Sequence, residues 1–402
     1  MSKAKVTFPS AAGLEYWTES EDAAVQQSTI FTPNNSATDV NAVILPKGTG
    51  SFIASIPDGT TTGGDSRGLN SVDLQTDVRS ASTQVASGDY SVVLGGRRNT
   101  ASAEIAGVLS GADNNSSGIG AVIAGGGGNS ASGILAFIGA GNDHIASGLQ
   151  SVICGGFNNQ ATNTAATIGG GTINTSTNIN SVVSGGQRNN ATGFGSSISG
   201  GYDNTSSGQY SHTVGRQNTA EADYSAGAGY QSITHLFAQN SHASGRFNVS
   251  GDAQEFTVLA RRQAQLTTGA TTVLTLDGTG TTNPIIVRTG AGSSAHTVWN
   301  VVASWAAVVT SISGTATGVN VGDVITQCNL FGFKEYSETP SIIGSVSNVG
   351  THNDASMASA TMTFGAAGTN QLTLTFAAPT FAGGGTLTMR VLCKLMITSI
   401  EF

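Results

Sequence analysis

The chain has 402 residues, a formal net charge of −8 and a charged fraction of only 10%, against roughly 25% in ordinary globular proteins. This length is sufficient for two or three domains, and the scarce, scattered basic residues predict no binding of nucleic acid. Three cysteines without a C-x-x-C pair build no disulfide framework and are expected to be small buried hydrophobic residues. No apolar run reaches the length of a transmembrane helix, and the first residues lack the apolar core of a signal peptide. We therefore predict neither membrane insertion nor a signal peptide.

Residues 1–75 read as an irregular, polar N-terminal region that attaches or caps the molecule. Within it, residues 41–60 place two apolar runs around Pro46, Gly48 and Gly50, a pattern typical of a β-hairpin. A glycine-rich connector then leads to a degenerate first coil at residues 76–90.

Eight consecutive fifteen-residue units fill residues 91–210 without insertion or deletion. A helical-pair repeat needs more than about thirty residues, so this period fits one coil of a β-solenoid. Units of fourteen and sixteen residues continue the pattern to about residue 252. The sequence therefore predicts a narrow parallel β-roll over residues 76–252.

The repeat positions, counted from Ser91, predict what each residue does. Gly at position six, Asn or His144 at position nine, and mostly Gly or Asn at position thirteen are predicted corners, because Gly and Asn accept left-handed backbone at low cost. Position three is always Val or Ile and is the predicted roll core. Its members are Val93, Val108, Ile123, Ile138, Ile153, Ile168, Val183 and Ile198.

Side chains alternate between the two faces of a strand, so positions one, three and five are expected inside the roll and positions two and four outside. The outside positions nevertheless carry sizeable apolar groups, which should not face water as a contiguous ladder. The pattern predicts that copies of the chain pack together there. The interface candidates are Val92, Leu94, Leu109, Val122, Phe137, Val152, Cys154 and Val182.

Residues 253–402 change to long alternating strands, as where Leu372, Leu374 and Phe376 fall on one face. Seven or eight such strands predict an antiparallel β-sandwich, or a jelly-roll-like domain. The sequence does not show whether the large residues of this domain are core residues or receptor contacts, so the receptor-binding residues stay unassigned. These residues are Trp299, Trp305 and Phe331.

The repeat S-x-V-x-G-G-x-x-N-x-A-S-G of residues 76–252 resembles the YadA-like head repeat of trimeric autotransporter adhesins. That resemblance implies a left-handed parallel β-roll and a homotrimer. The G-G-x-x-N form, preceded by LPKGTGSF and GGDSRG, also resembles repeat modules of bacteriophage tail fibres and virion spikes. The chain shows no signal peptide, coiled-coil stalk or four-strand membrane anchor, and this favours a phage fibre over an adhesin.

The resemblance implies a structural fibre or spike of the virion, on its tail or its head. Its N-terminal region is expected to bind other virion proteins, and its C-terminal domain a host surface glycan or outer-membrane protein. We predict no enzymatic activity, no catalytic residue, no cofactor and no metal. Two alternatives stay open: a spike with polysaccharide depolymerase activity, as in some phage spikes, and a bacterial surface adhesin.

Position eight carries the organised charges of the repeat. Arg98 precedes Asp113 by one coil, as Arg188 precedes Asp203, and each pair predicts a surface ion pair. Asp113 and Asp143 lie two coils apart, roughly 9.5 Å, at the upper edge of the carboxylate separation in inverting glycosidases. A solvated charge column is the preferred interpretation.

His144 replaces a corner asparagine and would recur three times in a trimer. One hypothesis is that these three histidines bind a metal or an anion on the three-fold axis. The preferred prediction is that His144 is a corner residue that faces solvent.

Overall fold

The structure is a computed structural model in which the chain forms two compact units, Met1–Thr49 and Gly50–Phe402. The described residues are 17–21, 29–33, 46, 48–76, 79–246, 250, 253–280, 285–286, 296–336, 339–367 and 371–401.

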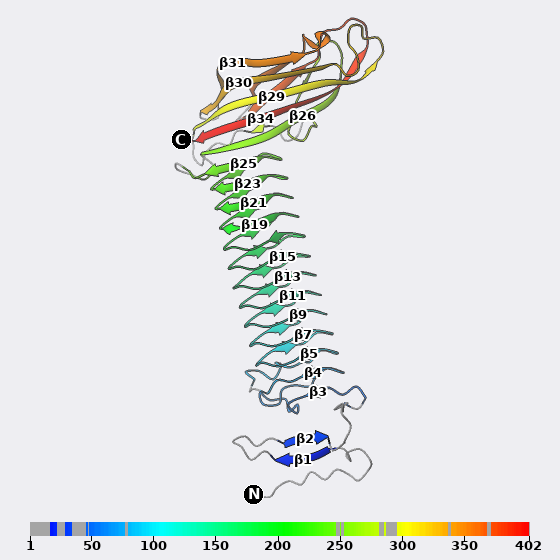
Figure 1. Cartoon of the computed structure of the whole chain (residues 1–402), viewed down its shortest axis with the longest axis vertical. Helices are drawn as coiled ribbons and strands as arrows, with labels where there is room; N and C mark the ends of the chain where they lie inside the picture. The colour runs from blue at the N-terminus through cyan, green and yellow to red at the C-terminus, as the bar shows by residue number, and fades with distance from the viewer. Residues whose placement is uncertain are drawn as a thin grey trace. The chain divides into compact units, whose positions relative to one another are not determined.

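In the first unit, β1 (Trp17–Glu21) pairs antiparallel with β2 (Thr29–Pro33) (Figure 1). Of the hairpin predicted for residues 41–60, residues 41–45 and 47 lie outside the described part. The described strand in that range, β3 (Phe52–Ile53), pairs in parallel with β4 (Val72–Asp73). β3 is thus the first strand of the solenoid ladder, and the other arm of the predicted hairpin lies outside the described residues.

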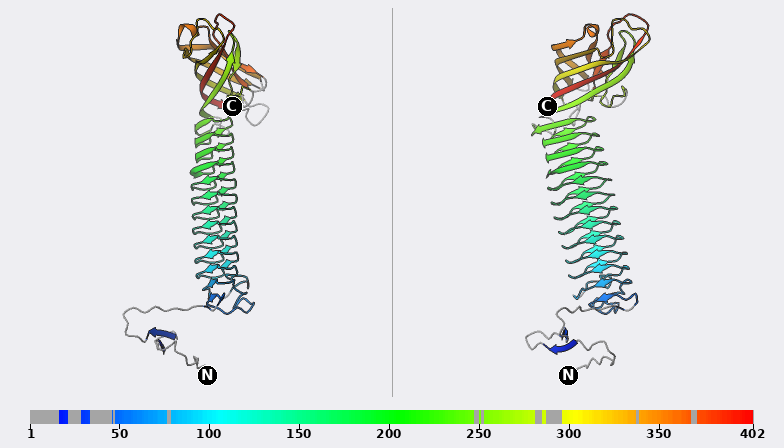
Figure 2. Two further views of the ribbon diagram at one scale, coloured as in Figure 1. Left: turned by 90° about the vertical axis from the view of Figure 1, so that its right-hand side faces the viewer. Right: turned by 45° about the vertical axis from the view of Figure 1, so that its right-hand side comes forward.

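The repeat region folds as a parallel β-solenoid of very short strands stacked coil on coil, as Figure 2 shows. The first ladder consists of β3, β4, β5 (Val92–Val93), β7 (Gly107–Val108), β9 (Val122–Ile123), β11 (Phe137–Ile138), β13 (Val152–Ile153), β15 (Thr167–Ile168), β17 (Val182–Val183), β19 (Ser197–Tyr202), β21 (His212–Arg216), β23 (Ala226–Tyr230) and β25 (Asn240–Ser244). The second ladder consists of β6 (Thr100–Ala101), β8 (Asn115–Ser116), β10 (Ser130–Ala131), β12 (Ile145–Ala146), β14 (Gln160–Ala161), β16 (Thr175–Ser176), β18 (Asn190–Ala191), β20 (Thr205–Ser206), β22 (Thr219–Ala220) and β24 (Ile233–Thr234). The fifteen-residue period is the pairing register itself, as Gly107 opposite Val122 illustrates.

The interior of the roll is narrow because it takes only small and β-branched side chains. Position three is fully buried throughout, at Val93, Val108, Ile123, Ile138, Ile153, Ile168, Val183 and Ile198. Position eleven faces it with buried Ala or Ser, such as Ala101 and Ser116. Position five differs from its prediction, since Ser110 and Ala140 are exposed where the chain already turns out of the strand.

The structure confirms the predicted corner at position six, whereas the other left-handed residues lie at positions eight and fifteen instead of nine and thirteen. Left-handed backbone occurs at positions six, eight and fifteen, as at Gly96 (φ 79°), Arg98 (φ 55°) and Ile105 (φ 59°). Position nine keeps ordinary backbone, and its asparagine is buried inside the roll. Where position thirteen is glycine, it leaves no room for a side chain: a Cβ on Gly118 would lie 2.0 Å from the carbonyl oxygen of Gly133 in the next coil.

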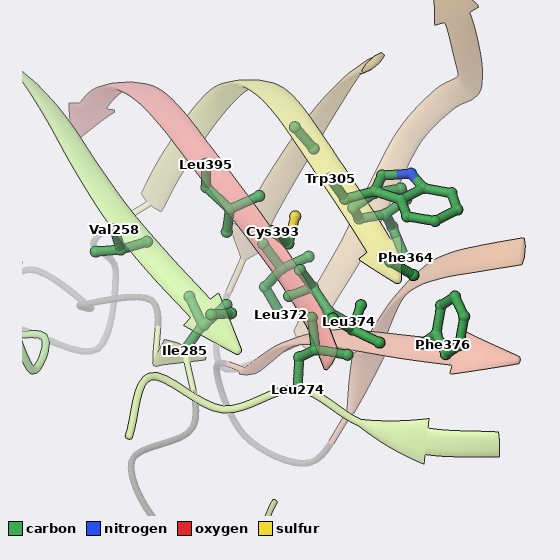
Figure 3. Packing of buried hydrophobic residues seen from close by; sticks show 14 of the residues in the cluster. Val258, Leu274, Ile285, Trp305, Phe364, Leu372, Leu374, Phe376, Cys393 and Leu395 are labelled. Carbon is green, nitrogen blue, oxygen red and sulfur yellow. The ribbon is translucent and has the colours of Figure 1, made fainter. Parts of the chain in front are cut away.

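The C-terminal part forms two antiparallel sheets, as the sequence predicts. The larger sheet has the order β26 (Ala253–Leu266), β34 (Thr386–Glu401), β29 (His296–Ser313), β30 (Val324–Tyr336) and β31 (Thr339–Asn353). The smaller contains β27 (Thr271–Val273), β28 (Ile285–Ile286), β32 (Thr361–Ala367) and β33 (Gln371–Ala377). Large side chains such as Trp305, Leu374 and Phe376 pack together in the core of this domain (Figure 3).

The chain is almost entirely β-structure. The described residues contain one helical segment, the 3₁₀ turn η1 (Ala355–Met357). Within that part of the chain, no helix has the length and apolar character that crossing a bilayer requires.

The roll and the C-terminal domain share a continuous sheet. β25 pairs antiparallel with β26, which pairs in turn with β34. Leu236 of the last coil belongs to the C-terminal core, and His235 contacts Phe256 with ring centroids 6.4 Å apart. The C-terminal domain therefore covers the end of the roll and is held by main-chain hydrogen bonds.

Candidate functional site

The eight interface candidates lie together on the outer face of the first ladder, and we call positions two and four of this ladder the outer column. Their exposed fractions include 49% at Leu94, 39% at Phe137 and 36% at Val182. The whole set, Val92, Leu94, Leu109, Val122, Phe137, Val152, Cys154 and Val182, is exposed or half-buried in the single chain. This face is thus apolar and uncovered by the chain's own residues.

A second apolar column follows the corner at positions fourteen and fifteen, which we call the corner column. Sequence reasoning missed it because it assigned no role to these two positions, although apolar residues recur there. Its exposed members are Ile105, Ile119, Ile134, Leu135, Leu149, Ile179, Tyr210 and Tyr224. Toward the C-terminal end it becomes a stack of rings, with centroids 5.3 Å apart for Phe194 and Tyr210 and 5.5 Å for Tyr210 and Tyr224.

Position nine is a buried hydrogen-bond ladder, the asparagine ladder. In a typical coil, Asn174 Nδ2 donates to the carbonyl oxygens of Gly170 and Gly186, both at 2.9 Å. Its Oδ1 accepts the backbone N–H of Asn189 at 3.0 Å. Each asparagine therefore satisfies polar backbone groups in two coils, which explains its recurrence better than a corner role does. The members are Asn99, Asn114, Asn129, Asn159, Asn174, Asn189, Asn204 and Asn218.

His144 stands in this ladder and is fully buried, so the prediction that it faces solvent is wrong. Its backbone N–H donates to Asn129 Oδ1 at 3.0 Å, and its Nδ1 accepts the N–H of Asn159 at 3.1 Å. Burial lowers the pKa of His144, while carbonyl groups of Gly156 and Ala140 act in the opposite direction. The imidazole replaces an asparagine amide, and no group of three or more His, Cys, Asp or Glu within the described residues gathers to hold a metal.

The charge column at position eight forms the predicted ion pairs. Arg98 Nη2 lies 2.8 Å from Asp113 Oδ2, and Arg188 Nε lies 3.7 Å from Asp203 Oδ1. Both pairs are partly exposed, where such contacts contribute little to stability. Asp113, half of the carboxylate pair considered for hydrolysis, is thus engaged by an arginine.

A buried charge cluster closes the N-terminal end of the roll, which sequence reasoning missed. Asp73 occupies the inward register position of Val93 and is fully buried. Its Oδ2 lies 2.8 Å from Arg67 Nε and 3.6 Å from Arg79 Nη2. Burial lowers the pKa of Arg79 and Asp73 opposes this shift. Gln75 accepts the N–H of Asn99 through Oε1, so it starts the asparagine ladder.

The three cysteines differ in environment. Cys154 is exposed, Cys328 is half-buried and Cys393 is buried. The expectation of small buried hydrophobic residues thus holds for Cys393, whose thiol pKa is raised by burial. It fails for Cys154, because position four points out of the roll.

The large residues considered for receptor contact are core residues. Trp299, Trp305 and Phe331 are 1%, 2% and 3% exposed. Trp299 Nε1 donates to Ser399 Oγ at 3.1 Å, and Trp305 Nε1 donates to Asn329 Oδ1 at 3.1 Å. Their polar atoms are already satisfied inside the domain.

Comparison with known proteins returns phage tailspikes among solved structures. No family model and no curated protein matches the chain. The tailspike protein of Acinetobacter baumannii phage AM24 is 9% identical, with a TM-score of 0.23, over 87% of this chain and 77% of that one. The tailspike protein of Acinetobacter phage vB_ApiP_P1 is also 9% identical, with a TM-score of 0.25, over 88% of this chain and 76% of that one.

This likeness corrects one prediction. The sequence interpretation excludes enzymatic activity, whereas the matched structures are phage tailspikes. The resemblance of the repeats already places depolymerases among such spikes. The exclusion of an enzyme therefore does not stand.

Proposed function

We propose that the chain is a spike or fibre of a bacteriophage virion that attaches the particle to the host cell surface. Residues 1–75, which include strands β3 and β4 of the first ladder, bind other virion proteins. The rest of the roll, to residue 252, is the spacer, and residues 253–402 bind a host surface glycan or outer-membrane protein. The observation that most directly supports this proposal is the unbroken strand pairing from β3 through β25 into β26. Continuous main-chain pairing makes the roll a stiff support for the domain at its end.

We also propose that the spike is a homotrimer. A ring of three identical chains uses a heterologous contact, so each copy must offer two different surfaces. The outer column and the corner column are two such surfaces, both apolar and both repeated at every coil. Packing one against the other would remove side chains such as Leu94 and Ile105, 49% and 59% exposed in the single chain, from water.

Light scattering tests the assembly. The expected mass is about three times the 40.3 kDa of one chain. Phe137→Glu places a charge in the outer column and should yield monomers, because burying an unpaired carboxylate is costly. The matched control is Ser147→Glu, an exposed position on the second ladder, which should leave the mass unchanged. A wild-type mass of 40.3 kDa would overturn the trimer.

Electron microscopy of virions labelled with antibody against this chain tests the location. Label on tail or head fibres is the expected result, and its absence from intact particles would contradict a spike. Incubating host polysaccharide with the protein, followed by size-exclusion chromatography, shows whether the glycan is cleaved. Fragments would establish the depolymerase alternative.

A further inference from the structure

The outward face of the larger C-terminal sheet is hollowed into a continuous groove. Its first hollow has a volume of about 570 Å³ and its second about 550 Å³. Both are lined by Ala306, Thr326 and Leu392, so they adjoin on β29, β30 and β34. Each volume falls within the range of small-ligand sites.

Three arginines line the first hollow: Arg261 and Arg262 on β26, and Arg390 on β34. Strand register places Arg390 opposite Gln263 and Leu392 opposite Arg261. Arg261 and Arg390 are therefore diagonal neighbours on one face of the sheet, within reach of a common ligand.

The contacts of these arginines are with neutral groups. Arg261 Nη2 and Arg262 Nη1 donate to the carbonyl oxygens of Asp277 and Gly278 at 3.5 and 3.3 Å. Arg390 Nε donates to Gln263 Oε1 at 2.9 Å.

Asp277 also lines the first hollow, so three arginines and one aspartate give its lining a net charge of +2. Arg262 Nε is buried and has no hydrogen-bond partner within the described residues. By contrast, Arg67, Arg98 and Arg188 each face an aspartate within 4 Å. Guanidinium groups bind carboxylate and phosphate oxygens in pairs, so an anionic ligand fits this end.

The second hollow offers a different chemistry. Ser304 and Thr326 line it on the outward face together with Ala306 and Leu392, whereas Gln327 and Thr351 are in register with the core residue Trp305. Hydroxyl groups that both donate and accept match the hydroxyls of a sugar. The groove thus combines an anion-binding end with a hydroxyl-binding end.

A second copy of the chain fits this groove less well. On the first ladder, the outer column turns largely polar before it reaches the C-terminal domain, at Ser184, Ser197, Ser199, His212, Asn240 and His242. The outer column, one of the two apolar surfaces proposed to join the copies, is therefore interrupted below the groove.

We propose that the groove binds an acidic glycan, a sugar chain carrying carboxylate or phosphate groups, with its anionic group held by Arg261 and Arg390, which lie on the same face of the sheet. This inference rests on the proposed function and names the ligand class of the host-binding domain.

Calorimetry with the full-length protein tests it, using polygalacturonate as the carboxylate probe, phosphorylated dextran as the phosphate probe and plain dextran as the neutral one. Binding of an anionic probe but not of plain dextran is expected. Arg390→Gln should weaken it about ten-fold, and Arg261→Gln combined with Arg390→Gln about a hundred-fold. The matched control is Lys394→Gln, which removes the same charge from β34 outside both hollows and should change affinity less than two-fold.

Three results would overturn the proposal: no binding of either anionic probe, an equal loss with Lys394→Gln, or a change of oligomeric mass in the arginine variants. The last would identify the groove as a contact between copies. An unchanged tryptophan fluorescence transition shows that the variants are folded. Antibody labelling of virions tests separately whether the chain is a virion spike. Failure of that proposal can therefore be distinguished from failure of glycan binding by the groove.

Discussion

The roll and the C-terminal domain differ in the kinds of side chains that they bury. A typical coil of the roll buries a Val or Ile, an Ala or Ser, and an Asn whose amide is hydrogen-bonded, as Val183, Ala191 and Asn189 show. The C-terminal domain buries large groups such as Trp299 and Phe333. A narrow core gains little from apolar burial, so the roll depends on repeated polar pairing, whereas the domain depends on packed volume.

The range of the interactions differs as well. The asparagine ladder joins residues fifteen apart, as Asn174 and Asn189 do. In the C-terminal domain, Trp299 reaches Ser399, one hundred residues away in sequence. Damage to the roll should therefore stay local, as in other repeat proteins, while damage to the domain should spread through it.

The largest effect is expected from the C-terminal core. Phe376→Ala removes a fully buried ring that lies 6.0 Å from Trp305 and should cost about 3–5 kcal/mol of unfolding free energy. Urea denaturation followed by tryptophan fluorescence measures it, since Trp299 and Trp305 lie in this domain and residues 91–252 contain no tryptophan. The control Val349→Ala, at a residue 62% exposed, should cost under about 1 kcal/mol. Equal effects would contradict a volume-based core.

The next effect is expected from the asparagine ladder. Asn174→Ala removes the partners of the Gly170 carbonyl and of the Asn189 N–H, while the Gly186 carbonyl keeps its hydrogen bond from the Thr172 N–H. It should cost about 2–3 kcal/mol. Faster hydrogen exchange confined to neighbouring coils, with an unchanged fluorescence transition, is the expected signature. Asn115→Ala, at an exposed position ten, is the control. A loss that also shifts the fluorescence transition would refute the local character of the roll.

A smaller, pH-dependent effect is expected at His144. Burial lowers its pKa from the ordinary 6.5, so the unfolded chain binds more protons below that pH and the folded roll loses stability as the pH falls. The loss is at most about 1.4 kcal/mol per pH unit. His144→Asn should remove it and leave stability above pH 6.5 nearly unchanged. Thermal unfolding by circular dichroism at several pH values measures this, with the exposed His242→Asn as control; parallel curves for wild type and His144→Asn would exclude a buried neutral imidazole.

The smallest effect is expected at the charge column. Arg98→Gln breaks the 2.8 Å pair with Asp113 and should cost less than about 1 kcal/mol, and less still at high salt. Hydrogen exchange of the neighbouring coils, measured at low and at high salt, gives this loss of stability. Its neighbour Arg97, also exposed, supplies the charge-matched control Arg97→Gln. A cost above that of Asn174→Ala would reverse the ranking of surface and interior pairing in the roll.

Several features of the roll were predictable because they depend on neighbouring coils alone. The period predicts the register, the Val or Ile column and the ion pair of Arg98 with Asp113, all confirmed in the structure. The direction of the asparagine side chain was not predictable from residue preference. Asn suits both a corner and a buried amide ladder, and only the positions of the surrounding carbonyls choose between them.

The long-range features needed the fold itself. Nothing in the spacing of Arg261 and Arg390, 129 positions apart in the sequence, indicates that β26 and β34 are neighbours and bring these residues to one groove. The same holds for Asp73, buried between two arginines at the N-terminal end.

The sequence by itself determined the coil, its register, its inward column and the all-β class, because a fifteen-residue period repeats the same local contacts at every turn. The tertiary structure decided which polar side chains are buried, where the second apolar column lies and where positive charge gathers. Those outcomes depend on pairing between strands that are distant in the sequence and on the carbonyl groups of adjacent coils. The sequence of one repeat unit does not specify where those groups lie.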